Sequence, residues 1–485
     1  TNRIDTASLF GIAQEAQAIL PQFGKKARLK VNPLETFSFA NLEQGSKNNI
    51  NVEIQEKNLV SRLSLIVLSG IRVGESAEKI KKRLSSCGVN TINNVVDISN
   101  YIRISLGQPC HIFDFDSIAG GKMNVRKSKK GEIVQTLDKD KITLPGDDIV
   151  ISDGDGKLID QPGIMGAYNS SVKEATKNVV LFVPVFNGKM VRRTSMLTGK
   201  RSDSASYFEK GIDEERTEAA LVFGVDLLKE FAGGLVSSNL IDIYENKYNP
   251  KKLTVSISEI NKLIGVEVDN KKIVEILLNL GFKVDANGDN LNVIPPSYRA
   301  NDISLNQDIT EEVARIYGYH NIPSQLQNME YVTAQKTIEE VIEKTKEIKG
   351  QLKHIGLIEI INYSMISTDQ LDNFNEKEED LLKISNPISQ DLLYLRSSLI
   401  PSLISNIKSN IGKQKIMKFF EISKAFKGNL NDLPDEILKL AFVTNTSYFD
   451  LKGIVEVLFK NLNIANVEFK QSNESHFAKD KQVSI

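Results

Sequence analysis

Cysteine is scarce in this chain: Cys87 and Cys110 are the two cysteines among 485 residues. So low a content gives no disulfide framework of the kind that secreted domains use, and it indicates a reducing cytosol. The four histidines are scattered, so a zinc site of the Cys/His kind is not predicted either. We therefore expect a cytoplasmic protein in which both cysteines are small core residues.

Long apolar runs are also missing. The longest candidate, LSLIVLSGI, has the length of a strand and not the ~18–20 residues of a membrane helix. The first residues, TNRIDTASLF, have neither the basic region nor the apolar core of a signal peptide. We therefore expect no membrane contact. Because the first residue is not Met, we also expect a fragment that lacks sequence at the front and at the back.

The overall charge is small. A formal net charge of −1 excludes a globally basic nucleic-acid binder, so any RNA contact has to come from local patches such as residues 189–201 (KMVRRTSMLTGKR). A run of this kind is more often a solvated face. Apolar residues at 41% and charged residues at 25% are typical of globular protein. At ~100–200 residues per domain, the length predicts roughly three domains.

Two helices are predicted near the start of the chain. Over residues 7–19, apolar side chains that include Leu9 and Ile12 recur at helical spacing. Over residues 75–88, Ser76 is positioned to cap a second amphipathic helix.

The middle of the chain changes from β-rich to mixed. From residue 89 to about 190, short β-rich runs alternate with turn clusters, which predicts a mainly β domain closed by a helix near 213–232. A compact unit follows at about 250–323, with a helix over 268–281 capped by Asp269. The rest alternates strand-like and helix-like segments and predicts an α+β domain.

Four carboxylates fall within eleven positions of PPSYRANDISLNQDITEEVARIYGYHNIP. They are Asp302, Asp308, Glu311 and Glu312. Ser304 and Gln307 form a capping-box pair, so a helix is expected from residue 305. Its buried stripe would be Leu305, Ile309, Val313 and Ile316.

These acids allow two interpretations. On one helix face they can present hard oxygen ligands to Mg²⁺. Acids in a first helical turn are also favoured by the helix dipole, and Arg315 can simply pair with Glu311. The spacing alone leaves both open.

The same stretch resembles the β subunit of bacterial-type phenylalanyl-tRNA synthetases. The pattern of that family, P-S-x-R-x-D-I, D-x-x-E-E-x-x-R-x-Y-G-Y and I-P, is similar to PSYRANDI, DITEEVARIYGY and NIP, with one extra residue between Arg299 and Asp302. Other segments resemble the family in the same order along the chain. They are TNRIDTASLFGIAQEAQAI, NNVVDISNYIRISLGQPCHIFDFDSI, GKRSDSASYFEKGID and ISNPISQDLLYLRSSLIPSLI followed by KFFEISKAF.

The resemblance implies an α+β multidomain fold. Residues 1–54 would be a helical N-terminal remnant, and 55–235 a mainly β, editing-type (B3/B4-like) domain. Residues 250–323 would be a small B5-like α/β unit with the acidic helix. Residues 330–485 would be a truncated class II synthetase-like domain with an antiparallel sheet, catalytically silent because no arginine set is seen that would clamp ATP phosphates. An oligonucleotide-binding-type domain before this chain and an anticodon-binding domain after it are also implied.

The resemblance further implies a function. In an α2β2 heterotetramer, the α subunit binds ATP and phenylalanine and attaches phenylalanine to tRNA-Phe, while the β subunit supports the reaction and contacts the tRNA. The four carboxylates would bind Mg²⁺ jointly with the α subunit.

The resemblance also implies an editing site that hydrolyses mischarged Tyr-tRNA. His111 matches the editing-site histidine of the family, although a histidine satisfied within the core is an equal alternative. Phe182 stands where the family typically has Glu, Ser202 and Ser204 where it has Thr and Ala, and Ala167 replaces a Gly. A carboxylate that accepts the tyrosine hydroxyl selects Tyr over Phe, and Phe182 cannot accept a hydrogen bond. We therefore predict weak or absent Tyr-tRNA editing.

Two other functions remain open at this point. One is a non-catalytic RNA-binding or scaffold protein derived from the β subunit. The other is a free-standing editing hydrolase, which Phe182 disfavours.

Overall fold

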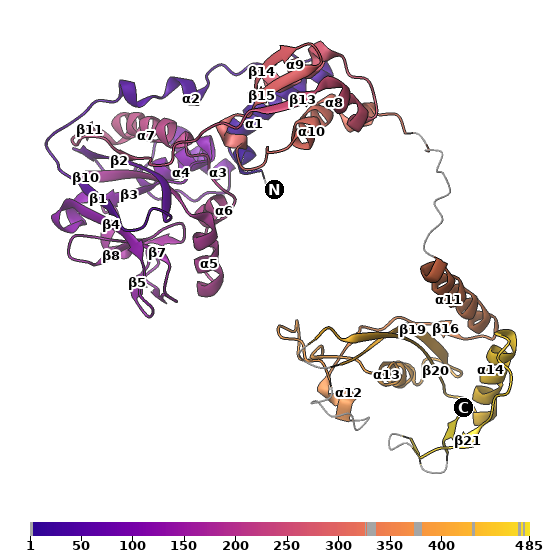
Figure 1. The fold of residues 1–485 in the computed structure, drawn as a ribbon. Coiled ribbons are helices and arrows are strands. Elements are labelled where there is room, and N and C mark those ends of the chain that lie inside the picture. The colour runs from indigo at the N-terminus through magenta and orange to yellow at the C-terminus, as the bar shows by residue number, and fades with distance from the viewer. Residues whose placement is uncertain are drawn as a thin grey trace. The chain divides into compact units, whose positions relative to one another are not determined.

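The structure, a computed structural model, describes residues 3–324, 326, 336–372, 381–428, 432–473, 477–478 and 481–485. Contacts within the chain divide it into two compact units, Thr1–Gln325 and Leu326–Ile485. Each unit mixes helices with small sheets, which confirms the α+β class in its coarse form (Figure 1). Within the described residues, no helix combines the length and apolar character that crossing a membrane requires.

The N-terminal unit contains a sheet in which the long strands β2 and β10 are antiparallel neighbours. Its strands are β11 (Leu235–Val236), β2 (Val60–Ser69), β10 (Asn178–Phe186), β3 (His111–Asp114) and β12 (Ile241–Ile243). Alternate residues of β10 enter different cores: Val180 and Phe182 enter one, and Val179 and Leu181 enter the other. Because successive side chains of a strand point to opposite faces, a strand covered on both sides is apolar throughout, as NVVLFVPVF is.

A second sheet shares the core of Val180 and Phe182. Its strands, in spatial order, are β1 (Asn51–Ile54), β4 (Lys122–Lys127), β7 (Ile149–Ser152), β8 (Leu158–Gln161) and β9 (Met165–Gly166). The small pair β5 (Ile133–Gln135) and β6 (Lys141–Thr143) lies beside it. Helices α4 (Val96–Leu106) and α7 (Arg216–Ala232) supply apolar side chains to the core on the other face of β10. The central sheet is thus enclosed on both faces.

A smaller layer of strands and helices follows. Its sheet has the order β13 (Leu253–Ser256), β15 (Asn290–Ile294) and β14 (Lys283–Asn287). Its helices are α8 (Ile257–Ile264), α9 (Asn270–Asn279) and α10 (Asn306–Tyr317). Ala18 of α1 (Leu9–Ile19) is part of the same core, so the N-terminal helix packs on this layer (Figure 1).

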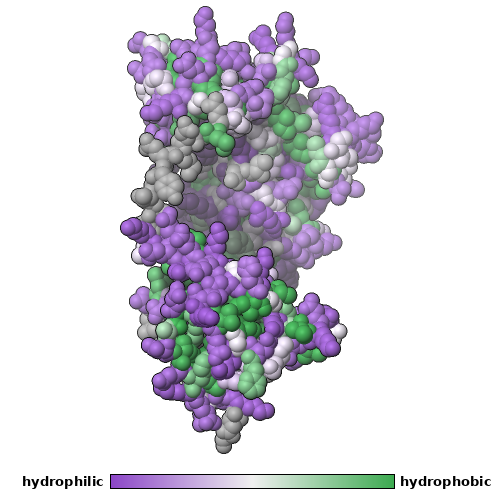
Figure 2. Space-filling view, turned by 90° about the vertical axis from the view of Figure 1, so that its right-hand side faces the viewer, coloured by the Kyte–Doolittle hydropathy of each residue, from purple (hydrophilic) through white to green (hydrophobic). Residues whose placement is uncertain are grey.

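The C-terminal unit contains a three-stranded sheet, β16 (Ile358–Glu359), β19 (Lys418–Lys427) and β20 (Asp435–Thr444). Its main helices are α11 (Lys336–His354), α13 (Ile400–Asn410) and α14 (Tyr448–Asn461). Figure 2 shows hydrophobic residues reaching the surface among hydrophilic ones. Strongly exposed apolar side chains of this unit are Ile361, Tyr363, Ile388, Ile411 and Phe449.

Several sequence predictions are confirmed. The predicted helix at 268–281 is α9, where the Asp269 side chain accepts the backbone N–H groups of Lys271 and Lys272. The helix near 213–232 is α7. Strands β14 and β15 form a hairpin, with Asn287 of β14 paired to Asn290 of β15.

Other predictions are wrong in detail. Leu9 and Ile12 are exposed, because α1 buries Phe10 on a different face. Ser76 does not cap α3 (Glu78–Ser86), since its hydroxyl donates to Asp97 at 2.6 Å. Cys87 is exposed rather than part of the core.

Candidate functional site

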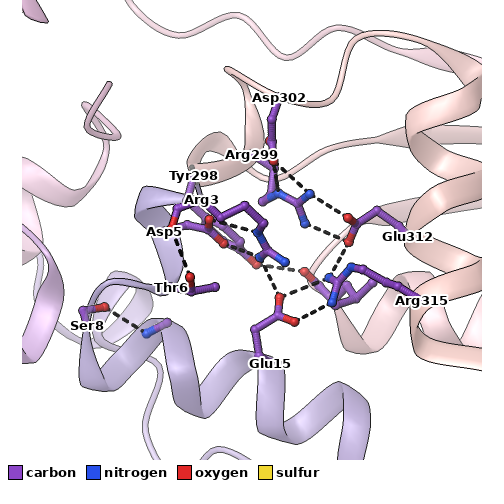
Figure 3. A network of polar contacts seen from close by, with 12 residues as sticks. Arg3, Asp5, Thr6, Ser8, Glu15, Tyr298, Arg299, Asp302, Glu312 and Arg315 are labelled. Carbon is purple, nitrogen blue, oxygen red and sulfur yellow. Dashed lines mark hydrogen bonds and ion pairs between the residues drawn. The ribbon is translucent and has the colours of Figure 1, made fainter. Parts of the chain in front are cut away.

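The acidic stretch lies at the start of α10, close to α1 (Figure 3). Glu312 is 3% exposed and accepts two hydrogen bonds from the Arg299 guanidinium, at 2.8 Å for Nη1–Oε2 and 2.7 Å for Nη2–Oε1. Arg315, one helical turn further on, donates to the same carboxylate through Nη2. Bidentate pairing of this kind is the strongest geometry between arginine and a carboxylate.

The ion pairs continue into α1. Arg315 donates to Glu15 at 2.6 Å for Nη1–Oε2, and Glu15 also accepts from Arg3 Nη2 at 2.6 Å. The Arg3 Nε group donates to Asp5 at 3.2 Å. Alternating charges therefore run from Asp5 to Glu312 and join α1 to α10 (Figure 3).

Mutual compensation keeps these enclosed groups ionised. Burial alone would raise the pKa of Glu312, but hydrogen bonds from Arg299 and Arg315 lower it to about 2. The pKa of Glu15 is likewise lowered, against its burial, by Arg315 and Arg3. Removing one member of such a buried set leaves an uncompensated buried charge. This costs far more stability than breaking an ion pair on the exposed surface.

The structure gives the four predicted metal ligands different surroundings. Asp302 accepts from Arg299 Nε at 3.0 Å, Glu312 is held by two guanidinium groups, and Glu311 is exposed. In the described part of the chain, no three His, Cys, Asp or Glu side chains are grouped so that they can hold a metal ion. In the single chain these residues therefore do not fit a four-carboxylate Mg²⁺ site.

Asp308 caps α10. Its Oδ2 accepts the backbone N–H groups of Ser304 and Leu305, each at 2.8 Å. The helix begins at Asn306 with Leu305 as its N-cap, and the predicted Ser304–Gln307 capping box is wrong, because the side chain that reaches back to the N-cap N–H is that of Asp308. Of the predicted stripe, Leu305 is exposed, and the other members are buried.

A pocket of about 100 Å³ in the N-terminal unit brings together the predicted editing-site residues. These residues are His111, Phe182, Ser202 and Ser204. They come from β3, from β10, and from the start of α6 (Asp203–Phe208). Residues far apart in the sequence therefore surround one cavity.

Three phenylalanine side chains line this pocket: Phe182, Phe186 and Phe208. Phe182 is fully buried and contacts Phe113 edge to face, with ring centroids 5.7 Å apart. Phe186 and Phe208 make a second edge-to-face pair at 5.4 Å. None of these rings accepts a conventional hydrogen bond from a substrate hydroxyl.

Two of the predicted polar residues have structural surroundings that limit their chemistry. The Ser202 hydroxyl donates to the Gly163 carbonyl at 2.5 Å and accepts the Ala205 N–H at 2.9 Å, so it caps α6. The His111 ring lies against Gly166, where an added Cβ would be 2.6 Å from the ring Cε1. Burial lowers the pKa of His111 to about 4, so the imidazole is neutral at pH 7.

Two further polar residues line this pocket and were not predicted from the sequence. Asp160 and Gln161 end β8, beside the turn into β9. Asp160 is 5% exposed, and burial raises its pKa to about 8. Their signal in the sequence is a polar pair at the end of a short strand, LIDQ, just before a Pro-Gly turn.

The basic stretch 189–201 is partly neutralised within the chain. Three of its cations form ion pairs: Arg193 with Asp148, Lys200 with Asp140, and Arg201 with Glu209. Much of its charge is therefore used in the fold, which favours the solvated-face interpretation over RNA contact.

Comparison with known proteins defines the class of this chain. Three family models match it: a B3/4 domain over residues 59–233, a tRNA synthetase B5 domain over 253–319, and a phenylalanyl-tRNA synthetase beta chain CLM domain over 322–485. The chain is thus built from aminoacyl-tRNA synthetase domains in the order that the resemblance implied.

The chain is also similar to particular relatives of known name. The chain is 35% identical over 484 residues to a phenylalanine–tRNA ligase beta subunit from Clostridium tetani, and 33% identical over 497 residues to one from Fusobacterium nucleatum. Each match covers 98% of this chain and 60% of the relative. The chain is similar along nearly its whole length to β subunits of phenylalanine–tRNA ligase, and it spans about 60% of the length of these relatives.

One solved structure is also similar, the N-terminal fragment of the phenylalanyl-tRNA synthetase β-subunit from Pyrococcus horikoshii. The match covers 66% of this chain and 85% of that fragment, with 20% sequence identity and a TM-score of 0.34. Similarity this low supports no argument about function.

Proposed function

We propose that this chain acts as the β subunit of phenylalanine–tRNA ligase, in the cytoplasm and in an α2β2 heterotetramer. In this complex the α subunit binds ATP and phenylalanine and charges tRNA-Phe. The observation that carries the proposal is the agreement along 98% of the chain with relatives of that name. We expect the domains to follow the sequence prediction: a remnant over 1–54, the editing-type domain over 55–235, the B5-like unit over 250–323 and the class II-like domain over 330–485.

The chemistry of the C-terminal unit supports a role without catalysis. Arg396 is the single arginine from residue 326 to 485. It has no exposed surface, and its Nη1 binds Glu421 at 2.8 Å. Arginine is the residue best suited to clamp phosphate groups, and this one is committed inside the fold. Charging would therefore depend on the α subunit, for which the exposed apolar side chains of this unit offer a contact surface.

The editing site, on this proposal, is the pocket around His111 and Phe182. It would hydrolyse Tyr-tRNA more slowly than the pocket of a relative that has a carboxylate in place of Phe182. Its small volume and the apolar ring of Phe182 in its wall support this expectation.

For Mg²⁺, the proposal is narrower than the resemblance implied. Both hydrogen bonds of Asp308 end on Oδ2, so Oδ1 and the exposed Glu311 carboxylate are the oxygens available on this chain. One or two carboxylates, completed by water and a partner, are a common Mg²⁺ arrangement. Asp302 and Glu312 would bind the Mg²⁺ ion only if their hydrogen bonds with arginine were broken.

The test is co-expression of the full reading frame with the α subunit of the same organism, followed by purification and charging of tRNA-Phe with phenylalanine in Mg²⁺. We expect a stable complex that charges, while α alone does not. A matched pair, Asp308→Asn and Asp285→Asn, separates a metal role from a general loss of acid, because Asp285 lies on β14 away from α10. Failure of the intact proteins to associate and charge would overturn the proposal.

A further inference from the structure

Gln161 is a buried polar residue without a partner. It has no exposed surface, and neither its Oε1 nor its Nε2 has a hydrogen-bond partner among the described residues. An unsatisfied buried amide is unfavourable, because the hydrogen bonds it made to water in the unfolded chain are not replaced. A functional role is one established reason for such a group to persist in a folded protein, and Gln161 lines the pocket.

Asp160, the preceding residue, adds a second polar group to the same cavity. Its carboxyl is nearly buried. Burial raises its pKa to about 8, against a hydrogen bond from the backbone N–H of Gln161, so most of it is protonated at pH 7. A protonated carboxyl can donate a hydrogen bond as well as accept one.

The remaining lining side chains include the polar residues His111 and Ser204 as well as apolar rings. Phe182, Phe186 and Phe208 are apolar, and the Ser202 hydroxyl already donates to the Gly163 carbonyl and accepts the Ala205 N–H. The amide of Gln161 has an unpartnered donor and an unpartnered acceptor in a cavity that three phenylalanines help to line.

We propose that Asp160 and Gln161 determine the specificity of this pocket by recognising a hydroxyl on the side chain of an ester-linked aminoacyl group. This inference rests on the proposed editing function and adds the groups that replace the missing carboxylate at position 182. The ligand class is an aromatic aminoacyl group with a terminal hydroxyl, the tyrosyl type. An engineered cavity of about 150 Å³ holds benzene. A cavity of about 100 Å³ therefore admits a phenol only after side-chain adjustment, which agrees with slow editing.

The test uses the complex of the full reading frame with the α subunit and two non-hydrolysable probes, 3′-amide-linked tyrosyl- and phenylalanyl-adenosine. The ratio of their Kd values is measured for the wild type, Gln161→Met and Asp160→Leu, which keep side-chain size and remove hydrogen bonding. Thr217→Val is the control, since Thr217 also has a buried, unpartnered hydroxyl but lies on α7 outside the pocket.

We expect the wild type to favour the tyrosyl probe by about tenfold or more, and Gln161→Met and Asp160→Leu each to remove most of that preference. Thr217→Val should retain it. Gln161→Met and Thr217→Val should both keep or raise the unfolding temperature, because each removes an unsatisfied buried group. If Gln161 had a purely structural role, Gln161→Met would instead lower the unfolding temperature and leave the ratio of Kd values unchanged.

Two results would overturn the inference: no preference for the tyrosyl probe in the wild type, or a preference that survives both pocket substitutions. Hydrolysis of Tyr-tRNA by the same complexes is measured in parallel. If the wild type hydrolyses Tyr-tRNA while the ratio of Kd values is the same in Gln161→Met and Asp160→Leu, the inference fails and the editing function stands. If hydrolysis is absent while the ratio depends on Gln161, the editing function fails and the recognition role stands.

Discussion

Replacing Glu312 by Gln tests whether the ion pairs between α1 and α10 hold the start of the chain in place. The substitution keeps the size of the side chain and removes the charge that compensates Arg299 and Arg315. Breaking a buried ion pair by removing one partner costs about 3–5 kcal/mol. A second route gives a similar value: lowering the pKa of Glu312 from 4.5 to about 2 corresponds to roughly 3 kcal/mol of stabilisation, at about 1.4 kcal/mol per unit.

Hydrogen exchange followed by mass spectrometry measures this effect locally, which suits a chain with two units that need not unfold together. Peptides covering α1 and α10 should lose protection by between about a hundredfold and a few thousandfold, since each 1.4 kcal/mol is a factor of ten. Peptides of β2 and β10 should change little. Glu311→Gln is the matched control, because Glu311 is exposed on the same helix and surface substitutions stay within about 0.5 kcal/mol. Equal protection in the two variants would refute the reasoning.

Three further predictions follow from the same structure. The stability of the N-terminal unit should fall as the pH rises from about 4 to about 8, because folded Asp160 keeps its proton up to a pKa of about 8 while the unfolded chain releases it near 3.8. Urea unfolding from pH 5 to 8 measures this fall. The same dependence of stability on pH in Asp160→Leu would contradict the prediction. Arg396→Met should destabilise the C-terminal unit by about 3–5 kcal/mol, because Glu421 would remain as a buried, uncompensated charge. Limited proteolysis or urea unfolding measures that loss, and the double variant with Glu421→Leu should recover most of it. Finally, adding Mg²⁺ to this chain without its partner, at constant ionic strength, should leave the thermal unfolding midpoint unchanged; a clear rise would show that the chain forms a metal site alone.

The sequence by itself determined local structure wherever spacing and end signals agreed. In α9, Asp269 at the start, apolar residues at helical spacing and Gly281 at the end all indicate the same helix, and the structure has it. Five ordered segments similar to one family also predicted which relatives the chain matches, because each is a pattern of many residues. Local patterns were misleading where a side chain had a distant partner, as for Ser76, whose hydroxyl binds Asp97 instead of the helix start.

Tertiary structure decided what the chemistry-bearing residues do. The sequence showed four acids on one stretch, but only the fold brings Arg299 and Arg315 around Glu312 and connects Arg315 to Glu15, which is 300 positions away. Likewise, nothing local marks Gln161 as buried and unpaired, because only the folded chain brings it to the same cavity as side chains of β10 and α6. Charge compensation and desolvation arise between segments distant in sequence, and for that physical reason they could not be read from the order of residues alone.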